Sequence, residues 1–130
     1  MKREKLNLVF VLNHDKTKVL LQKQNRGPFK GLWNGVGGKR EPEDASNKAG
    51  AIRELWEETY LEASKEQLFK VATIKTHNKE LHVYTLAVRE DQPQQGEDEI
   101  INWFSIEDIM KEPAWLAGNG NIPWLINLCR

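Results

Sequence analysis

The sequence predicts an α/β fold in which helices pack against a mixed β-sheet. Short apolar segments and helical patterns alternate along the chain in the order strands, helix, strands, helix. Clusters of Pro, Gly, Asn and Asp fall between these segments, where turns are expected. No internal repeat or break in composition divides the 130 residues, a length typical of one domain. We therefore expect a single domain spanning residues 1–130.

Each element is predicted from a local pattern. Strands are expected at residues 6–12, 19–21, 33–36, 68–76, 81–88 and 101–104. The first two strands should form a hairpin, and Gly37 and Gly38 should end the third. A helix is predicted from Ser46 to about Thr59. A short helix should begin at Ser105, and a terminal helix should run from 121 to 130 because Pro123 follows Asn121.

Charge and composition exclude several classes of protein. Lysine plus arginine and aspartate plus glutamate both total 19, so bulk charge cannot hold a nucleic acid polymer. No apolar run approaches the ~20 residues needed to span a membrane, and the N-terminus has no export-signal pattern. The single cysteine, Cys129, cannot form an internal disulfide. We expect a cytoplasmic protein, either a monomer or a homodimer.

Three glutamates on the first predicted helix stand out. Glu54, Glu57 and Glu58 share one face at helical spacing, and only Arg53, four residues before Glu57, offsets their repulsion. Such a carboxylate cluster suits a hard divalent cation such as Mg²⁺, although an ordinary solvated helix face is the alternative. The opposite face, expected to face the core, carries Ala49, Ile52, Leu55 and Trp56.

The segment Gly37-Gly38-Lys39-Arg40-Glu41-Pro42, followed by Arg53-Glu54-Leu55-Trp56-Glu57-Glu58-Thr59-Tyr60-Leu61, resembles the Nudix hydrolase box. Three departures from the box are visible. Asp44 stands where the family has glutamate, and eight residues rather than seven separate it from Arg53. Tyr60 replaces the second glycine, so we expect a different helix C-cap, because tyrosine tolerates a left-handed backbone poorly.

The resemblance implies a Nudix fold, an α/β/α sandwich with a mixed β-sheet, and a Mg²⁺ (or Mn²⁺) cofactor. It assigns the metal to Glu54, Glu57, Glu58 and the Gly37 carbonyl, with Arg53 orienting the glutamates. It also implies one more ligand from a later loop, Glu99 or alternatively Glu97, although this acidic cluster could equally be a solvated loop. Either Glu54 or Glu58 serves as general base. Lys23, Arg26 and Lys39 are candidate phosphate neighbours, or simply surface charges.

Residues 31–39 also resemble the corresponding segment of MutT-type and mammalian oxidised-purine nucleoside triphosphatases. The resemblance implies base contacts from Asn7, Asn34 and Asn121, with Asn119 as the alternative to Asn121, and stacking by Trp115. Asn121 could instead be only a helix cap, and Trp115 only a packing residue. Ala117 and Gly118 replace the paired aspartates of the mammalian type, so base selectivity should differ.

These two resemblances together imply a Mg²⁺-dependent pyrophosphohydrolase of a purine nucleoside triphosphate such as 8-oxo-dGTP. The alternatives are a Nudix hydrolase of another nucleoside diphosphate derivative, such as ADP-ribose, and a non-catalytic nucleotide-binding module.

Overall fold

The computed structural model describes residues 2–96, 99–112, 116 and 121–130. The strands are β1 (Glu4–Asn13), β2 (Lys18–Lys23), β3 (Trp33–Asn34), β4 (Val36–Lys39), β5 (Phe69–Lys75), β6 (Lys79–Val88) and β7 (Ile101–Ser105). The helices are α1 (Asn47–Thr59), the short 3₁₀ helix η1 (Lys65–Gln67), α2 (Ile106–Lys111) and α3 (Ile122–Cys129).

The described strands form one mixed sheet. β1 lies at its centre, parallel to β6 and antiparallel to β2 and β4. β5 pairs with β6, and both β3 and β7 pair with β2, all antiparallel. The predicted hairpin of the first two strands is confirmed, and the Asn13 side-chain oxygen closes its turn by accepting from the amides of Thr17 and Lys18, both at 2.9 Å.

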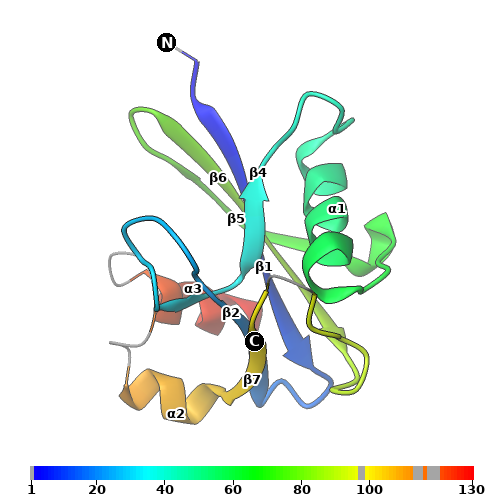
Figure 1. Ribbon diagram of the computed structural model, residues 1–130, viewed down its shortest axis with the longest axis vertical. Helices are drawn as coiled ribbons and strands as arrows, with labels where there is room; N and C mark the ends of the chain where they lie inside the picture. Colours follow the sequence, from blue (N-terminus) through cyan, green and yellow to red (C-terminus); the bar gives the residue numbers. More distant parts are fainter. Residues whose placement is uncertain (1, 97–98, 113–115, 117–120) are drawn as a thin grey trace.

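The sheet separates two hydrophobic layers, as the alternation of side chains along β1 requires. Phe10 and Leu12 face α2 and α3, whereas Val9 and Val11 face α1. Figure 1 shows α1 on one side of the strands and α2 with α3 on the other. Since β1 is covered on both faces, it reads as a continuous apolar run. The predicted α/β/α sandwich with a mixed sheet is confirmed.

The helix α1 begins where predicted, and its end corrects one expectation. The Ser46 hydroxyl accepts from the Ala49 amide at 3.1 Å, a side-chain N-cap. At the other end Tyr60 adopts φ 57° and ψ 21°, the left-handed conformation in which glycine is usual. The expectation of a different cap was therefore wrong. The rings of Trp56 and Tyr60 pack edge to face, with their centroids 5.5 Å apart, and this contact offsets part of the backbone strain at Tyr60.

Two further expectations are corrected. Trp56 was expected in the core, but 48% of its surface is exposed, because it packs on Tyr60 at the outer side of α1. The single strand expected at 33–36 is two strands, and β4 continues through Gly37 and Gly38 rather than ending at them, because these glycines pair with β1. Within the described residues, no helix combines the length and apolar character needed to cross a bilayer.

Candidate active site

Two glycines bring β4 unusually close to its neighbours. A Cβ atom on Gly37 would lie 2.0 Å from the backbone oxygen of Asn7 in β1. A Cβ atom on Gly38 would lie 2.5 Å from Oε1 of Glu54 in α1. At Gly37 the atom in the way belongs to the backbone and cannot move aside, so only glycine lets β4 run this close to β1, whereas at Gly38 the Glu54 side chain would have to shift.

Carboxylates and cations meet in a cavity of about 190 Å³ beside β4. Glu58 comes from α1, and Glu99 comes from the segment just before β7. The full lining is Gln22, Lys23, Gln24, Asn25, Arg26, Gly37, Glu58 and Glu99. The cavity therefore offers carboxylate oxygens to a cation and cationic side chains to an anion at the same place.

Glu58 is under electrostatic strain in this cavity. The pKa of its carboxyl is raised to about 8, first by burial and then by the negative charges of Glu54 and Glu99, while a hydrogen bond from Gln22 acts in the opposite direction. Its buried Oε2 finds no hydrogen-bond partner among the described residues. Burial also raises the pKa of Glu54, against the attraction of Arg53. A positive charge bound here would relieve both groups.

The chemistry of these donors fits a hard divalent cation, which prefers carboxylate and carbonyl oxygens. Two observations support that fit. Oε2 of Glu58 has no hydrogen-bond partner among the described residues, and Gly37 lines the same cavity as Glu58. In the described part of the chain, no three acidic, imidazole or thiol groups already lie in a ligating arrangement. The assignment of Glu54, Glu57, Glu58 and Glu99 as ligands therefore stays a prediction.

Arg53 ties the acidic helix to the preceding loop. Its Nε and Nη2 donate to the two carboxylate oxygens of Asp44 at 2.9 and 3.0 Å, and its Nη1 lies 3.1 Å from Glu57. Nη2 also lies 3.3 Å from Glu54. The fork of hydrogen bonds holds the pKa of Asp44 below its usual range and raises the pKa of Arg53. This network fixes α1 relative to the loop and to β4.

A second cavity, of about 290 Å³, adjoins the first, and Gln24 and Gly37 line both. Its remaining lining consists of aliphatic side chains, side-chain amides and glycines from four parts of the fold: Leu6, Asn7, Leu8, Asn34, Gly35, Gly38, Leu81, Asn121 and Ile122. The side-chain oxygen of Asn121 is buried and has no partner among the described residues. An apolar pocket with a few convergent polar groups is typical of a small-molecule site.

Comparisons with known proteins identify the family. The model of the NUDIX domain matches residues 3–125. This chain belongs to the NUDIX domain family. A curated Nudix relative, the oxidized purine nucleoside triphosphate hydrolase of Danio rerio, is 32% identical over 114 residues, which cover 83% of this chain and 71% of that protein. The chain is accordingly a Nudix hydrolase, from a family whose enzymes use divalent metal ions and act on small nucleotide substrates.

Solved Nudix structures share the fold. A MutT structure, from work on the proteins of Aliivibrio salmonicida and Vibrio cholerae, aligns with a TM-score of 0.77 at 19% identity, covering 99% of this chain and 98% of that one. The NUDIX domain of Shewanella oneidensis NrtR, complexed with ADP ribose, aligns with a TM-score of 0.78 at 20% identity, covering 98% and 86%. At such identities the likeness shows the Nudix fold alone.

The structure brings some of the predicted Nudix site residues together. Lys23, Arg26, Gly37, Glu58 and Glu99 line the first cavity. Asn7, Asn34 and Asn121 line the second. The Asn121 side chain makes no capping hydrogen bond, although it precedes α3.

Other predicted residues lie apart from these cavities. Glu57 is half exposed and pairs with Arg53, and Lys39 pairs with Glu4 at 3.2 Å. Asn7, by contrast, lines the second cavity; its amide is buried beside Gly50 of α1, and neither of its polar atoms has a partner within the described residues. Trp115, Asn119 and Glu97 lie outside the described residues.

Sequence reasoning missed two glutamines, Gln22 in β2 and Gln24 just after β2. Gln22 donates to the Glu99 carboxylate and also hydrogen-bonds Glu58, and it is buried. Gln24 stands at the junction of the two cavities. A signal existed for Gln22, because this polar residue directly follows an apolar strand pattern, at the position where alternation places it beside the buried Leu20.

Proposed function

We propose that this Nudix hydrolase is a Mg²⁺-dependent (or Mn²⁺-dependent) pyrophosphohydrolase of oxidised purine nucleoside triphosphates such as 8-oxo-dGTP. The observation that carries the proposal is that the two cavities are neighbours, with Gln24 and Gly37 in the lining of both. One cavity has the apolar and amide lining that suits a purine, and the other has the charges that suit a triphosphate. The activity printed for the zebrafish relative agrees with this assignment.

Glu54, Glu58, Glu99 and the Gly37 carbonyl would hold the cation, with Glu57 as a further candidate. When bound, a divalent cation lowers the pKa of the attacking water and neutralises phosphate charge. Lys23 and Arg26 are placed to contact the phosphate oxygens.

In the proposed reaction, water attacks a phosphorus atom of the triphosphate and one P–O bond breaks. The products are the nucleoside monophosphate and pyrophosphate. The water proton passes to a carboxylate of α1, for which Glu58 is better placed than Glu54. Glu58 lines the cavity, whereas the Glu54 carboxylate packs against Gly38 and lies beside Arg53.

Asn34 and Asn121 would recognise the base. An amide both donates and accepts, which matches the alternating groups on the edge of an oxidised purine. The buried oxygen of Asn121 has no partner among the described residues, and this supports a ligand here, because leaving such a group unsatisfied costs about 1–3 kcal/mol.

A substrate panel tests the proposal. We expect kcat/KM with Mg²⁺ to be at least about 10-fold higher for 8-oxo-dGTP than for dGTP, dATP, dCTP or ADP-ribose, with pyrophosphate as the second product. A preference for ADP-ribose would overturn the oxidised-purine assignment. Binding of nucleotides without turnover in Mg²⁺ or Mn²⁺ would instead indicate a non-catalytic module.

Two variants, one at the residue before α3 and one within α3, test base recognition. Asn121→Leu should lower kcat/KM for 8-oxo-dGTP by about 10-fold or more and reduce its preference over dGTP. Asn127→Leu, the same change at an exposed position of α3, should leave both values unchanged. Equal effects of the two substitutions would refute the role of Asn121.

A further inference from the structure

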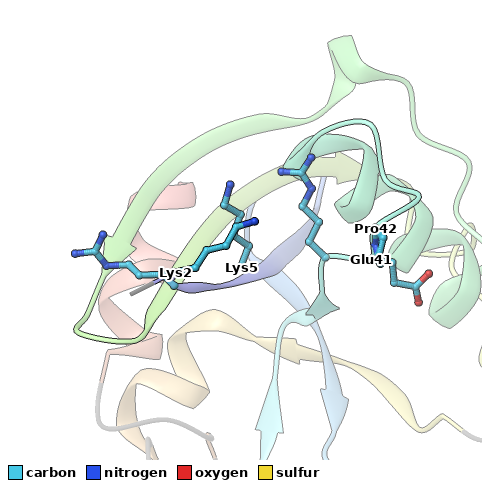
Figure 2. Close-up of a pocket in the computed structure, with 6 residues that line it drawn as sticks. Lys2, Lys5, Glu41 and Pro42 are labelled. Carbon is cyan, nitrogen blue, oxygen red and sulfur yellow. The ribbon is translucent and has the colours of Figure 1, made fainter.

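A further hollow, separate from the two active-site cavities, is lined mainly by basic residues. It has a volume of about 430 Å³ and is formed by the start of β1 and the segment after β4 (Figure 2). Its lining is Lys2, Arg3, Lys5, Arg40, Glu41 and Pro42. None of these six residues lines the active-site cavities described above. The hollow is therefore a separate place at which a ligand could bind.

Among the described residues, the cations of this hollow form no close ion pair, although Arg40 interacts with the charge of Asp44 and Lys5 with that of Glu80. Its only acidic residue, Glu41, lies 3.5 Å from Arg53, and Figure 2 shows its carboxylate directed away from the Lys2 and Lys5 amino groups. Within the described residues, no carboxylate lies within 4.0 Å of the charged groups of Lys2, Lys5 or Arg40. In a chain with no net charge, this concentration of cations favours an anionic ligand.

Part of the hollow is held in place before any ligand binds. The Arg40 guanidinium donates to the side-chain oxygen of Asn47 at 3.2 Å and to the backbone oxygen of Asp44 at 3.3 Å. The Arg40 amide donates to the backbone oxygen of Lys5 at 3.0 Å, which fixes these two cationic residues side by side. Prior ordering of this kind lowers the entropy cost of binding.

We propose that this hollow binds the phosphate chain of a polyphosphate anion without a divalent metal. Arginine and lysine together suit phosphate oxygens, and the volume falls in the range of roughly 300–1,000 Å³ found for ligand clefts. Among the described residues no aromatic side chain lines the hollow, so it lacks the rings on which a nucleobase stacks best. The phosphate chain, and not a base, is what it recognises. The chain comes either from an inorganic polyphosphate or from a free nucleotide.

Calorimetric titration of the full chain with inorganic tripolyphosphate tests the proposal, with EDTA present so that no metal bridges the anion to the active-site carboxylates. We expect saturable binding that weakens at least 10-fold in Lys2→Gln/Lys5→Gln and about 3-fold in Lys2→Gln alone. The matched control Lys65→Gln/Lys111→Gln removes two exposed charges elsewhere and should change the affinity less than 2-fold. Hydrolysis with saturating Mg²⁺ should be unchanged in all three variants.

The remaining outcomes are equally decisive. No saturable binding of tripolyphosphate, or equal loss in the two double variants, overturns the proposal. A nucleoside triphosphate that binds with the same variant dependence identifies the nucleotide as a source of the chain, whereas binding of tripolyphosphate alone identifies the inorganic source. A single-stranded oligonucleotide that binds more tightly than both, and is lost in Lys2→Gln/Lys5→Gln, would replace the polyphosphate assignment with a nucleic acid one.

Discussion

The Glu58 carboxyl group is a point at which activity and stability should respond in opposite directions. We predict that Glu58→Gln lowers kcat by at least about 100-fold, because it removes the proposed cation ligand and the proposed base. The same substitution should stabilise the metal-free protein at neutral pH. Glutamine has the shape of glutamate and can still hydrogen-bond, but it is neutral already, whereas Glu58 must take up a proton on folding to become neutral beside Glu54 and Glu99.

The size of the stabilisation follows from proton linkage. The pKa of Glu58 is about 8 in the folded protein against an ordinary 4.5, so the folded state binds more protons than the unfolded chain between these values. This group therefore destabilises the fold increasingly as the pH rises through that window, and its cost vanishes below about pH 4. Linkage gives a cost of under about 1 kcal/mol at pH 5 and about 3 kcal/mol at pH 7.

Chemical denaturation in EDTA at several pH values measures this effect. The excess unfolding free energy of Glu58→Gln over the unsubstituted protein should grow from pH 5 to pH 7, whereas Glu62→Gln, at an exposed position, should stay within about 0.5 kcal/mol throughout. Adding Mg²⁺ to 100 times its dissociation constant should stabilise the unsubstituted protein by about 2.7 kcal/mol and the variant by less. A pH-independent difference, or a less stable variant, would refute the reasoning.

Three further substitutions probe the frame of the site. In a chemical denaturation assay, Gly37→Ala should lower the unfolding free energy by about 3 kcal/mol, because the added Cβ would meet a β1 backbone oxygen. The control Gly96→Ala should lower it by under about 1 kcal/mol, because the nearest atom to its Cβ would be 3.5 Å away. Arg53→Lys should lower kcat/KM by about 10- to 100-fold, because lysine cannot reproduce the two-pronged contact, and near-normal kinetics would contradict this. Tyr60→Ala should destabilise by about 1–2 kcal/mol because it keeps the left-handed strain and loses the Trp56 contact, while Tyr60→Gly should change thermal stability by less than about 1 kcal/mol.

Local signals were sufficient for the fold. The continuous apolar run of β1 predicted a strand, and the Ser46 cap predicted the start of α1 within a residue. Each of these features depends on neighbours in the sequence, such as the cap hydroxyl and the amide three residues later. The separation of the two helical layers then followed from burial of β1 on both faces.

Features set by distant contacts were not predictable from the sequence pattern. Helical spacing assigned Trp56 to the core and Glu54 to the charged face, yet Trp56 is exposed and Glu54 is only 8% exposed. The difference arises because Gly38 of β4 packs directly on Glu54. The face of α1 that meets the sheet therefore includes Glu54 rather than Trp56. The contribution of Gln22 likewise depends on the return of the chain at Glu99, 77 residues later.

The longer loop before α1 shows why a change in motif spacing need not disturb a site. Asp44 stands where the box has a longer glutamate, and an extra residue separates it from Arg53. In the structure Asp44 still reaches both prongs of the Arg53 guanidinium and also accepts from the Glu41 amide at 2.8 Å. A shorter acid on a longer loop thus makes the contact that orients Arg53. Because the constraint is the distance from the carboxylate to the guanidinium rather than the residue count, the acidic face of α1 keeps its place beside β4.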